Sequence, residues 1–182
     1  MPFVPGRVQG RLSLGEPGSG GIRVVHQDQV GHLEGRPDGL IVVEAAPFSY
    51  AMIGILDRAA FVALGCNDLM QTLFAADWDQ PRLRRYLDPY APVLYRFLGQ
   101  VAASAEGRLD RVQVCGLLPQ IRGVLPLLLG LGYRAFSVDT VMIPWLARVV
   151  RTTRLSDARA LVERACLSRN ARELRALLNL PG

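Results

Sequence analysis

The stretch Phe61–Gln71, FVALGCNDLMQ, joins a short apolar run, a polar turn and a helical pattern without interruption. Its first part, Phe61–Leu64, predicts a buried strand, and Leu69–Phe74 predicts a helix. The turn between them is Gly65–Asp68. Proteins of the α/β class present reactive groups in this arrangement, at the carboxyl end of a strand. The segment therefore predicts an α/β fold with a functional site at the turn.

The composition is that of a folded, water-soluble chain. Of its 182 residues, 50% are hydrophobic and 20% are charged, which predicts one globular domain with a sizeable core. The longest apolar run, Val124–Leu131, contains a proline and a glycine and is too short to cross a bilayer. The N-terminus lacks a cationic segment followed by an apolar one, so we expect no signal peptide and no membrane partner.

The charged residues and the cysteines indicate which partners and which cellular compartment to expect. The net charge is +5, and all the basic side chains other than histidine are arginines. These arginines lie near acidic residues at helical spacing, as in Arg159 and Glu163, which predicts solvated helix faces rather than a nucleic-acid surface. The 3 cysteines form no CxxC pair. We therefore expect no nucleic-acid partner and a reducing, cytoplasmic location.

Two parts of the chain differ in composition. Residues 1–39 are rich in glycine and form a lead-in in which Arg7–Leu14 and Ile22–Val25 are candidate strands of a β-hairpin. Residues 40–182 carry the periodic segments of an α/β domain. We therefore predict an N-terminal hairpin-like segment followed by one domain.

Strand patterns in the second part alternate with helical ones. Strands are predicted at Leu40–Val43, Phe61–Leu64 and Arg111–Cys115, and Ala135–Val138 is a further short extended piece. Helices are predicted at Phe48–Arg58, from Asp88-Pro89 to about Ser104, at Ile121–Leu131, at Ile143–Arg151, and from openings at Ser156 and Asn170. Successive βα units predict a parallel sheet or part of a (β/α) barrel.

Each predicted strand ends on a residue that can carry chemistry. These residues are Glu44, Asn67 with Asp68, and Cys115, and in a barrel they would share one rim. Backbone amides at a helix start suit an anion, and a carboxylate suits a divalent cation. Plainer interpretations remain open: Asn67-Asp68 as an Asx turn that caps the helix, and Cys115 as a core cysteine.

An ordered set of short motifs extends these observations into a family resemblance. The motifs are Val42–Glu44, Leu64–Gln71, Ala75–Asp77, Asp88-Pro89, Val114–Gly116, Leu127–Gly132 and Phe136-Ser137. In this order they resemble the C-terminal part of the phosphoenolpyruvate-utilising barrel of phosphoenolpyruvate–protein phosphotransferase (enzyme I), pyruvate phosphate dikinase and phosphoenolpyruvate synthase. The resemblance covers Leu40–Pro181 and implies a partial (β/α)8 TIM-type barrel with parallel strands, preceded by the short hairpin-like segment.

The resemblance also implies roles for particular residues. Glu44 and Asp68 stand where the family binds Mg²⁺, and Cys115 stands where its acid/base cysteine protonates the enolate to release pyruvate. The positions that resemble the family's phosphoenolpyruvate-binding residues are Gly65, Cys66, Asn67 and Gly116. Three positions depart from the family pattern: Trp78 replaces an arginine, Leu117 replaces a glutamate, and Cys66 replaces the usual threonine or serine.

Two functions from different classes follow. The first is a phosphoenolpyruvate- and Mg²⁺-binding phosphotransferase domain, related to enzyme I of the sugar phosphotransferase system, which transfers a phosphoryl group to a histidine and is incomplete on its own. The second is a degenerate, non-catalytic protein-interaction or regulatory module, which Trp78 and Leu117 favour. Because a partial barrel leaves open sheet edges, we expect a homo-oligomer or docking on a larger protein.

Overall fold

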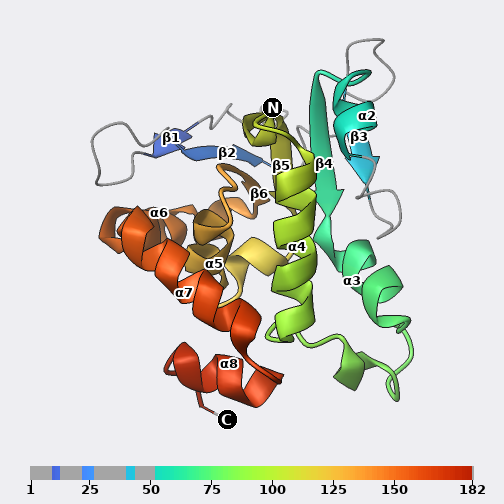
Figure 1. The fold of residues 1–182 in the computed structure, drawn as a ribbon, viewed down its shortest axis with the longest axis vertical. Helices are drawn as coiled ribbons and strands as arrows, with labels where there is room; N and C mark the ends of the chain where they lie inside the picture. The colour runs from blue at the N-terminus through green and yellow to red at the C-terminus, as the bar shows by residue number, and fades with distance from the viewer. Residues whose placement is uncertain (1–9, 13–21, 27–39, 44–51, 182) are drawn as a thin grey trace, which may run out of the picture.

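The computed structural model describes residues 10–12, 22–26, 40–43 and 52–181, and these form a sheet with helices packed against it (Figure 1). The strands are β1 (Gly10–Leu12), β2 (Ile22–His26), β3 (Leu40–Val43), β4 (Phe61–Gly65), β5 (Val112–Cys115) and β6 (Ala135–Val138). The helices are α2 (Met52–Leu56), α3 (Cys66–Phe74), α4 (Pro92–Ser104), α5 (Val124–Gly130), α6 (Ile143–Thr152), α7 (Leu155–Leu167) and α8 (Ala171–Leu177). Short 3₁₀ turns lie at Arg84–Tyr86, Leu109–Arg111, Leu118–Gln120 and Thr140–Met142.

The sheet has the order β1-β2-β6-β5-β4-β3. Strands β3 to β6 are parallel and adjacent in chain order, β2 runs parallel to β6, and β1 pairs antiparallel with β2. The α/β class and the N-terminal strand pair are as predicted. The short extended piece predicted at Ala135–Val138 is strand β6, which pairs with both β2 and β5. Among the described residues the sheet is open, with β1 and β3 at its edges.

The two faces of the sheet differ because side chains alternate along each strand. One face, which we call the helix face, contributes only apolar side chains to the core. They are Val43, Val62, Leu64, Val112, Val114, Phe136 and Val138, and every described helix adds buried residues to the same core. In Figure 1, helices α4, α5 and α7 lie in front of this face.

The other face, which we call the opposite face, carries smaller and more polar side chains. The ladder places Ala63 beside Gln113, Gln113 beside Ala135, and Gly65 beside Cys115. Ser137 lies two residues beyond Ala135 on this face. None of these side chains belongs to the helix-side core, although Ala63, Gln113, Ala135 and Ser137 are all buried.

Two helices start later than the sequence predicts. The predicted start of α4 at Asp88-Pro89 was wrong, because the Asp88 carboxylate accepts a hydrogen bond from the Tyr90 amide (2.9 Å) and closes a turn, so that the helix begins at Pro92. Helix α5 begins at Val124 rather than at Ile121, because Gly123 turns the chain with a φ of 80°. Of the predicted helix Phe48–Arg58, residues 48–51 lie outside the described residues.

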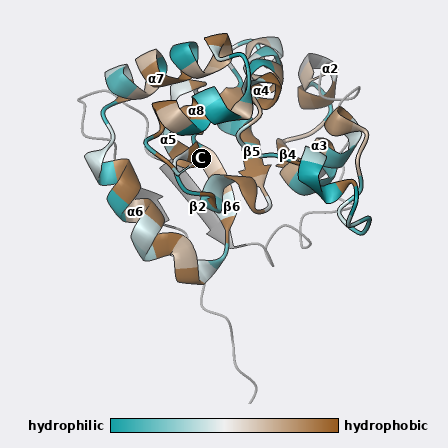
Figure 2. Ribbon diagram, turned by 90° about the horizontal axis from the view of Figure 1, so that it is seen from below, coloured by the Kyte–Doolittle hydropathy of each residue, from teal (hydrophilic) through white to brown (hydrophobic). Residues whose placement is uncertain are grey.

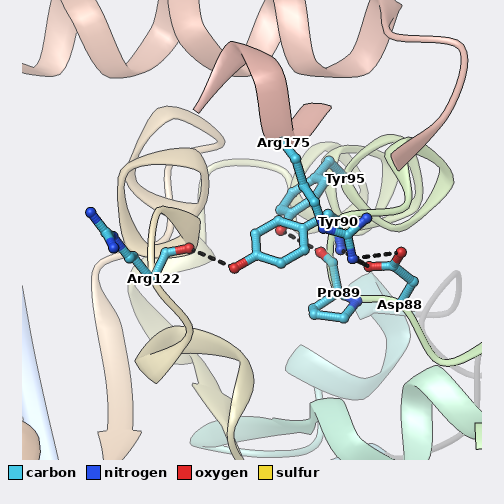
Figure 3. Close-up of polar contacts among 6 residues, drawn as sticks. All are labelled: Asp88, Pro89, Tyr90, Tyr95, Arg122 and Arg175. Carbon is cyan, nitrogen blue, oxygen red and sulfur yellow. Dashed lines mark hydrogen bonds and ion pairs between the residues drawn. The ribbon is translucent and has the colours of Figure 1, made fainter. Parts of the chain in front are cut away.

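The C-terminal helix α8 begins as predicted and is held by specific contacts. Asn170 caps it by accepting a hydrogen bond from the Glu173 amide (3.0 Å). Arg175 binds both carboxylate oxygens of Asp88 at 2.9 Å and stacks on the Tyr90 ring at 4.7 Å (Figure 3). This bidentate pair joins the end of the chain to the loop that precedes α4.

None of the helices among the described residues has the length and hydropathy needed to span a bilayer.

Candidate ligand site at the carboxyl ends of the strands

The turn between β4 and α3 is the centre of the candidate site. Helix α3 begins at Cys66, directly after the strand, so the amides of Cys66, Asn67 and Asp68 are its first and lack acceptors within the helix. The Asp68 carboxylate lies in this first turn and is exposed. Gly65 has a φ of −74°, which any residue adopts, so the backbone does not require glycine there. These amides form a place where an oxyanion can bind.

The Cys66 side chain is buried, unlike those of Asn67 and Asp68. It lies fully within the core on the helix side. Burial raises the pKa of the Cys66 thiol well above its ordinary value, and the nearby Cys115 adds to the shift. Of this predicted binding residue, therefore, only the backbone amide can reach a ligand.

A hydrogen bond joins the β4 turn to the loop after β5. The Leu117 amide donates to Asn67 Oδ1 at 3.1 Å. Gly116, between Cys115 and Leu117, has a φ of 94°, and a Cβ built on it would lie 2.9 Å from Asn67 Oδ1. Both the backbone conformation and the close approach thus require glycine at this position. The bond leaves the Asn67 Nδ2 group as the donor that can face a ligand.

Cys115 closes β5 on the opposite face of the sheet and is half-buried. Its Sγ donates to the carbonyl oxygen of Leu64 at 3.0 Å, across the ladder in β4. A carbonyl oxygen only accepts, so the Cys115 thiol is the donor in this contact. The structure therefore brings Cys115, Gly116 and the Asn67–Asp68 turn together, as the sequence predicts.

Trp78 connects the turn to the loop after α3. Its indole Nε1 donates to the Asn67 carbonyl at 3.1 Å, and its backbone amide donates to Gln71 Oε1 at 2.9 Å. Gln71 Nε2 in turn donates to Asp68 Oδ1 at 2.7 Å. Trp78 is half-buried against the core, whereas Leu117 is 61% exposed. Through these hydrogen bonds, Trp78 holds the Asn67–Asp68 segment from the loop that follows α3.

The predicted metal ligands can be compared with the structure only in part. Glu44 lies outside the described residues. Within the described ranges, no group of three or more His, Cys, Asp or Glu side chains could hold a metal ion. Asp68 is exposed and uses Oδ1 for Gln71, which leaves Oδ2 as a hard oxygen donor. A carboxylate of this kind fits a Mg²⁺ ion that takes its remaining ligands from water, substrate and one further carboxylate.

Two polar side chains to which the sequence interpretation gave no role lie on the opposite face. Gln113 and Ser137 are each 1% exposed, and among the residues that the structure describes Gln113 Nε2 and Ser137 Oγ have no hydrogen-bond partner. The signal was present in the alternation of Val112–Cys115, where a polar residue separates two valines. Asp139 also ends a strand, but its Oδ1 accepts from the Val141 amide at 3.2 Å and starts a 3₁₀ turn.

The edge of the sheet that carries the turn is visible from below. In Figure 2, seen from that side, α3 and α8 stand at this edge, and both show hydrophilic stretches. Figure 2 thus shows hydrophilic helix surface at the end of the molecule where the parallel strands have their carboxyl ends.

Three relatives share this part of the chain. The chain is 35% identical over 138 residues to multiphosphoryl transfer protein 1 of Escherichia coli (strain K12), covering 76% of this chain and 17% of the relative. It is 35% identical over 128 residues to the phosphoenolpyruvate-protein phosphotransferase of Staphylococcus carnosus (strain TM300), covering 69% and 22%. It is 28% identical over 144 residues to the phosphoenolpyruvate-protein phosphotransferase of Haloferax volcanii, covering 79% and 26%.

These matches have two consequences. The chain spans only about a fifth of the length of the first two relatives, at 17% and 22%. Residues 35–155 match the model of the family described as PEP-utilising enzyme, PEP-binding domain, and this range contains the β4 turn, Trp78 and Cys115. The chain therefore belongs to the phosphoenolpyruvate-binding domain family of the phosphoenolpyruvate-utilising enzymes.

Proposed function

We propose that this domain binds phosphoenolpyruvate at the carboxyl ends of β4 and β5 and takes part in transferring its phosphoryl group to a histidine. The hydrogen bond between the Leu117 amide and Asn67 Oδ1 carries the proposal, because it joins an anion-binding helix start to the loop of a thiol. An anion site beside a proton donor is what cleavage of an enol phosphate requires.

The phosphoryl side of the substrate would face the start of α3. The amides of Cys66, Asn67 and Asp68 and the Asn67 Nδ2 group donate to its oxygens, and Gly116 leaves room for the close approach. Glu44 and Asp68 would hold Mg²⁺. When bound, this ion offsets the negative charge of the phosphoryl group in transit.

Cys115 would supply the proton that completes the reaction. The P–O bond of the enol phosphate breaks, an N–P bond forms on the acceptor histidine, and an enolate is left. The S–H bond of Cys115 then breaks and a C–H bond forms at the methylene carbon, which gives pyruvate and a thiolate. The thiolate regains its proton from solvent. The hydrogen bond to the Leu64 carbonyl supports this role, because in it the thiol acts as a donor at the carboxyl end of β5.

We further propose that the sheet is part of a (β/α)8 barrel. Parallel neighbours in chain order, with every described helix packed on one face, are typical of a barrel wall and not of a doubly wound sheet, which carries helices on both faces. The opposite face would then be the inner wall. A second copy of the chain or a larger cytoplasmic protein partner would complete the barrel and supply the acceptor histidine.

The deciding experiment is a calorimetric titration of phosphoenolpyruvate into the protein, with and without Mg²⁺. We expect binding that requires Mg²⁺ and that weakens about tenfold or more in Asp68→Asn, because one charged ligand is lost. Asp110→Asn is the matched control, since Asp110 is exposed in the turn that precedes β5, at the other end of the strand. Absence of heat under all conditions would contradict the proposal.

The non-catalytic alternative gains no support from Trp78. Its contacts with Asn67 and Gln71 hold the turn in place, as a working site requires.

A further inference from the structure

Three arginines lie in the loop that follows α3, the helix of the candidate site. The segment between α3 and α4 contains Arg82, Arg84 and Arg85, and all three are exposed. Within the part of the chain that the structure describes, none of them forms an ion pair with a carboxylate; the ion pairs there involve Arg108, Arg169 and Arg175. The same segment contains three aspartates, Asp77, Asp79 and Asp88, so its net charge is zero, and it offers the site individual guanidinium groups rather than a positive patch.

Arg84 is the member of this set that is tied to the site. Its Nε donates to the Trp78 carbonyl at 3.0 Å. Trp78 in turn donates from its indole to the Asn67 carbonyl at 3.1 Å and from its amide to Gln71 at 2.9 Å. Gln71 donates to Asp68 at 2.7 Å. A continuous series of hydrogen bonds thus runs from Arg84 to both polar residues of the turn.

The backbone around Arg84 is held as well. The Arg84 amide donates to the Gln80 carbonyl at 3.0 Å, and the Leu87 amide donates to the Arg84 carbonyl at 3.1 Å. These bonds form the short 3₁₀ turn Arg84–Tyr86. The position of the side chain is therefore set both by its own backbone and by the Trp78 carbonyl.

The other two arginines differ in this respect. Arg85 donates to the Tyr86 hydroxyl at 3.0 Å and lies over the Tyr86 ring at 4.9 Å, so its guanidinium is already engaged by its neighbour. Arg82 has no hydrogen bond or ion pair within the described residues that would direct it. Only Arg84 combines a tether to the site with terminal nitrogens that the tether leaves open.

The charge of the proposed substrate makes a cation necessary. A phosphate monoester carries between about one and a half and two negative charges near neutral pH, and the carboxylate adds another. Asp68, the charged side chain in the first turn of α3, is also negative. A guanidinium presents its terminal N–H groups in a planar fork that matches two phosphate oxygens.

We propose that Arg84 binds the phosphoryl group of the substrate from the loop side and that Trp78 positions it. The inference rests on the proposed function. It adds a substrate-binding residue from a loop that the sequence interpretation left unassigned, and it gives Trp78 a positioning role in the site. The occupant is an organic phosphate, with its phosphoryl group held between the first amides of α3 and the Arg84 guanidinium.

The test compares two variants with the same change of charge. Phosphoenolpyruvate is titrated calorimetrically in the presence of Mg²⁺ into the unmodified chain, Arg84→Gln and Arg85→Gln. We expect Arg84→Gln to weaken binding about 10- to 100-fold, as for the loss of a charged hydrogen bond, and Arg85→Gln to change it less than about threefold. Trp78→Phe keeps most of the packing but loses the indole donor, and we expect an intermediate loss.

A second ligand separates a binding role from a structural one. Oxalate resembles the enolate of pyruvate but has no phosphoryl group, so its Mg²⁺-dependent affinity should be the same in Arg84→Gln as in the unmodified chain. A parallel loss for oxalate would overturn the inference, because it would mean that the variant damages the site as a whole. Unfolding midpoints of the variants, measured in the same buffer, confirm that each is folded.

The outcomes distinguish this inference from the proposed function. If the unmodified chain binds phosphoenolpyruvate and Arg84→Gln behaves like Arg85→Gln, the role of Arg84 is wrong and the proposed function stands. If the unmodified chain does not bind phosphoenolpyruvate at all, both are wrong. A selective loss in Arg84→Gln, with oxalate binding retained, supports both.

Discussion

The helix face and the opposite face of the sheet are built from the same strands but have different side chains. On the helix face, alternate residues of β3 to β6 are Val, Leu and Phe, and all belong to one core. On the opposite face, β4 to β6 contribute one large apolar residue, Phe61, and otherwise small or polar residues, namely Ala63, Gly65, Gln113, Cys115, Ala135 and Ser137. The helix face therefore supplies most of the stability of the domain, and the opposite face carries the groups that can do chemistry.

The separation has a simple physical reason. Large apolar side chains give the greatest free energy of burial, so they gather where the helices cover the strands. Small and polar side chains give less, but they leave room for a ligand and for hydrogen bonds. Cys115 is the last opposite-face residue of β5, and the Gly116 loop comes directly after it. Both therefore lie at the carboxyl end of this face. Stability and function can thus be altered separately in this domain.

The largest effect is expected from a phenylalanine pair. Phe136 lies on the helix face and is 2% exposed, whereas Phe61 lies at the start of β4 on the opposite face and is only half-buried. Phe136→Ala should lower the free energy of unfolding by about 3–5 kcal/mol, and Phe61→Ala by about half as much or less. Urea denaturation measures both. Equal losses would contradict the comparison.

Cysteine reactivity tests the comparison without a mutation. Cys66 is fully buried in the helix-side core, and burial raises its thiol pKa, so at neutral and mildly alkaline pH it forms less thiolate than an ordinary cysteine. Cys115 is half-buried at the edge of the opposite face. Iodoacetamide should modify Cys115 roughly 100-fold faster or more, because Cys66 must first become exposed by opening of the structure. Mass spectrometry of digested protein gives the two rates. Similar rates would show that Cys66 is accessible.

The loop of Gly116 should show a smaller effect with an internal control. Gly116 and Gly107 both have positive φ, at 94° and 82°, but a Cβ on Gly107 would meet nothing within 4 Å. Alanine at either site should cost about 1 kcal/mol or more for the backbone conformation. Gly116→Ala should cost about 1 kcal/mol beyond that, because Asn67 must move. If Gly107→Ala is as harmful, the Asn67 contact has no energetic role.

The smallest effect is expected at Gln113. Its Nε2 is buried and has no hydrogen-bond partner in the described part of the chain, so replacing the side chain with an apolar one of similar size removes an unsatisfied group. Gln113→Leu should therefore leave the free energy of unfolding within about 1 kcal/mol or increase it. Thermal and urea unfolding provide the measurement. A clear loss of stability would mean that the amide is bonded in solution, and the polar character of the opposite face would then contribute to stability too.

Much of the fold and part of the site could be predicted from local patterns. The strand Leu40–Val43, the strand predicted at Phe61–Leu64 and the Asn170 cap each depend on residues close together in sequence and are found where the sequence predicts. The same holds for the turn of Asn67 and Asp68, because a strand followed at once by a helix leaves its first amides open wherever it occurs. Helix α3, however, begins three residues before the predicted Leu69, because it follows β4 directly.

The tertiary structure decided the features that depend on residues distant in sequence. It decided that the extended piece Ala135–Val138 lies between β2 and β5, because strand pairing depends on segments far apart in sequence. It decided the start of α4, because the Asp88 carboxylate accepts hydrogen bonds from the Tyr90 amide and the distant Arg175 and does not cap the helix. It also revealed that Trp78 joins Asn67 to Arg84, through hydrogen bonds that only the folded loop brings within reach. Such contacts require that widely separated segments have already packed, and local sequence patterns do not encode them.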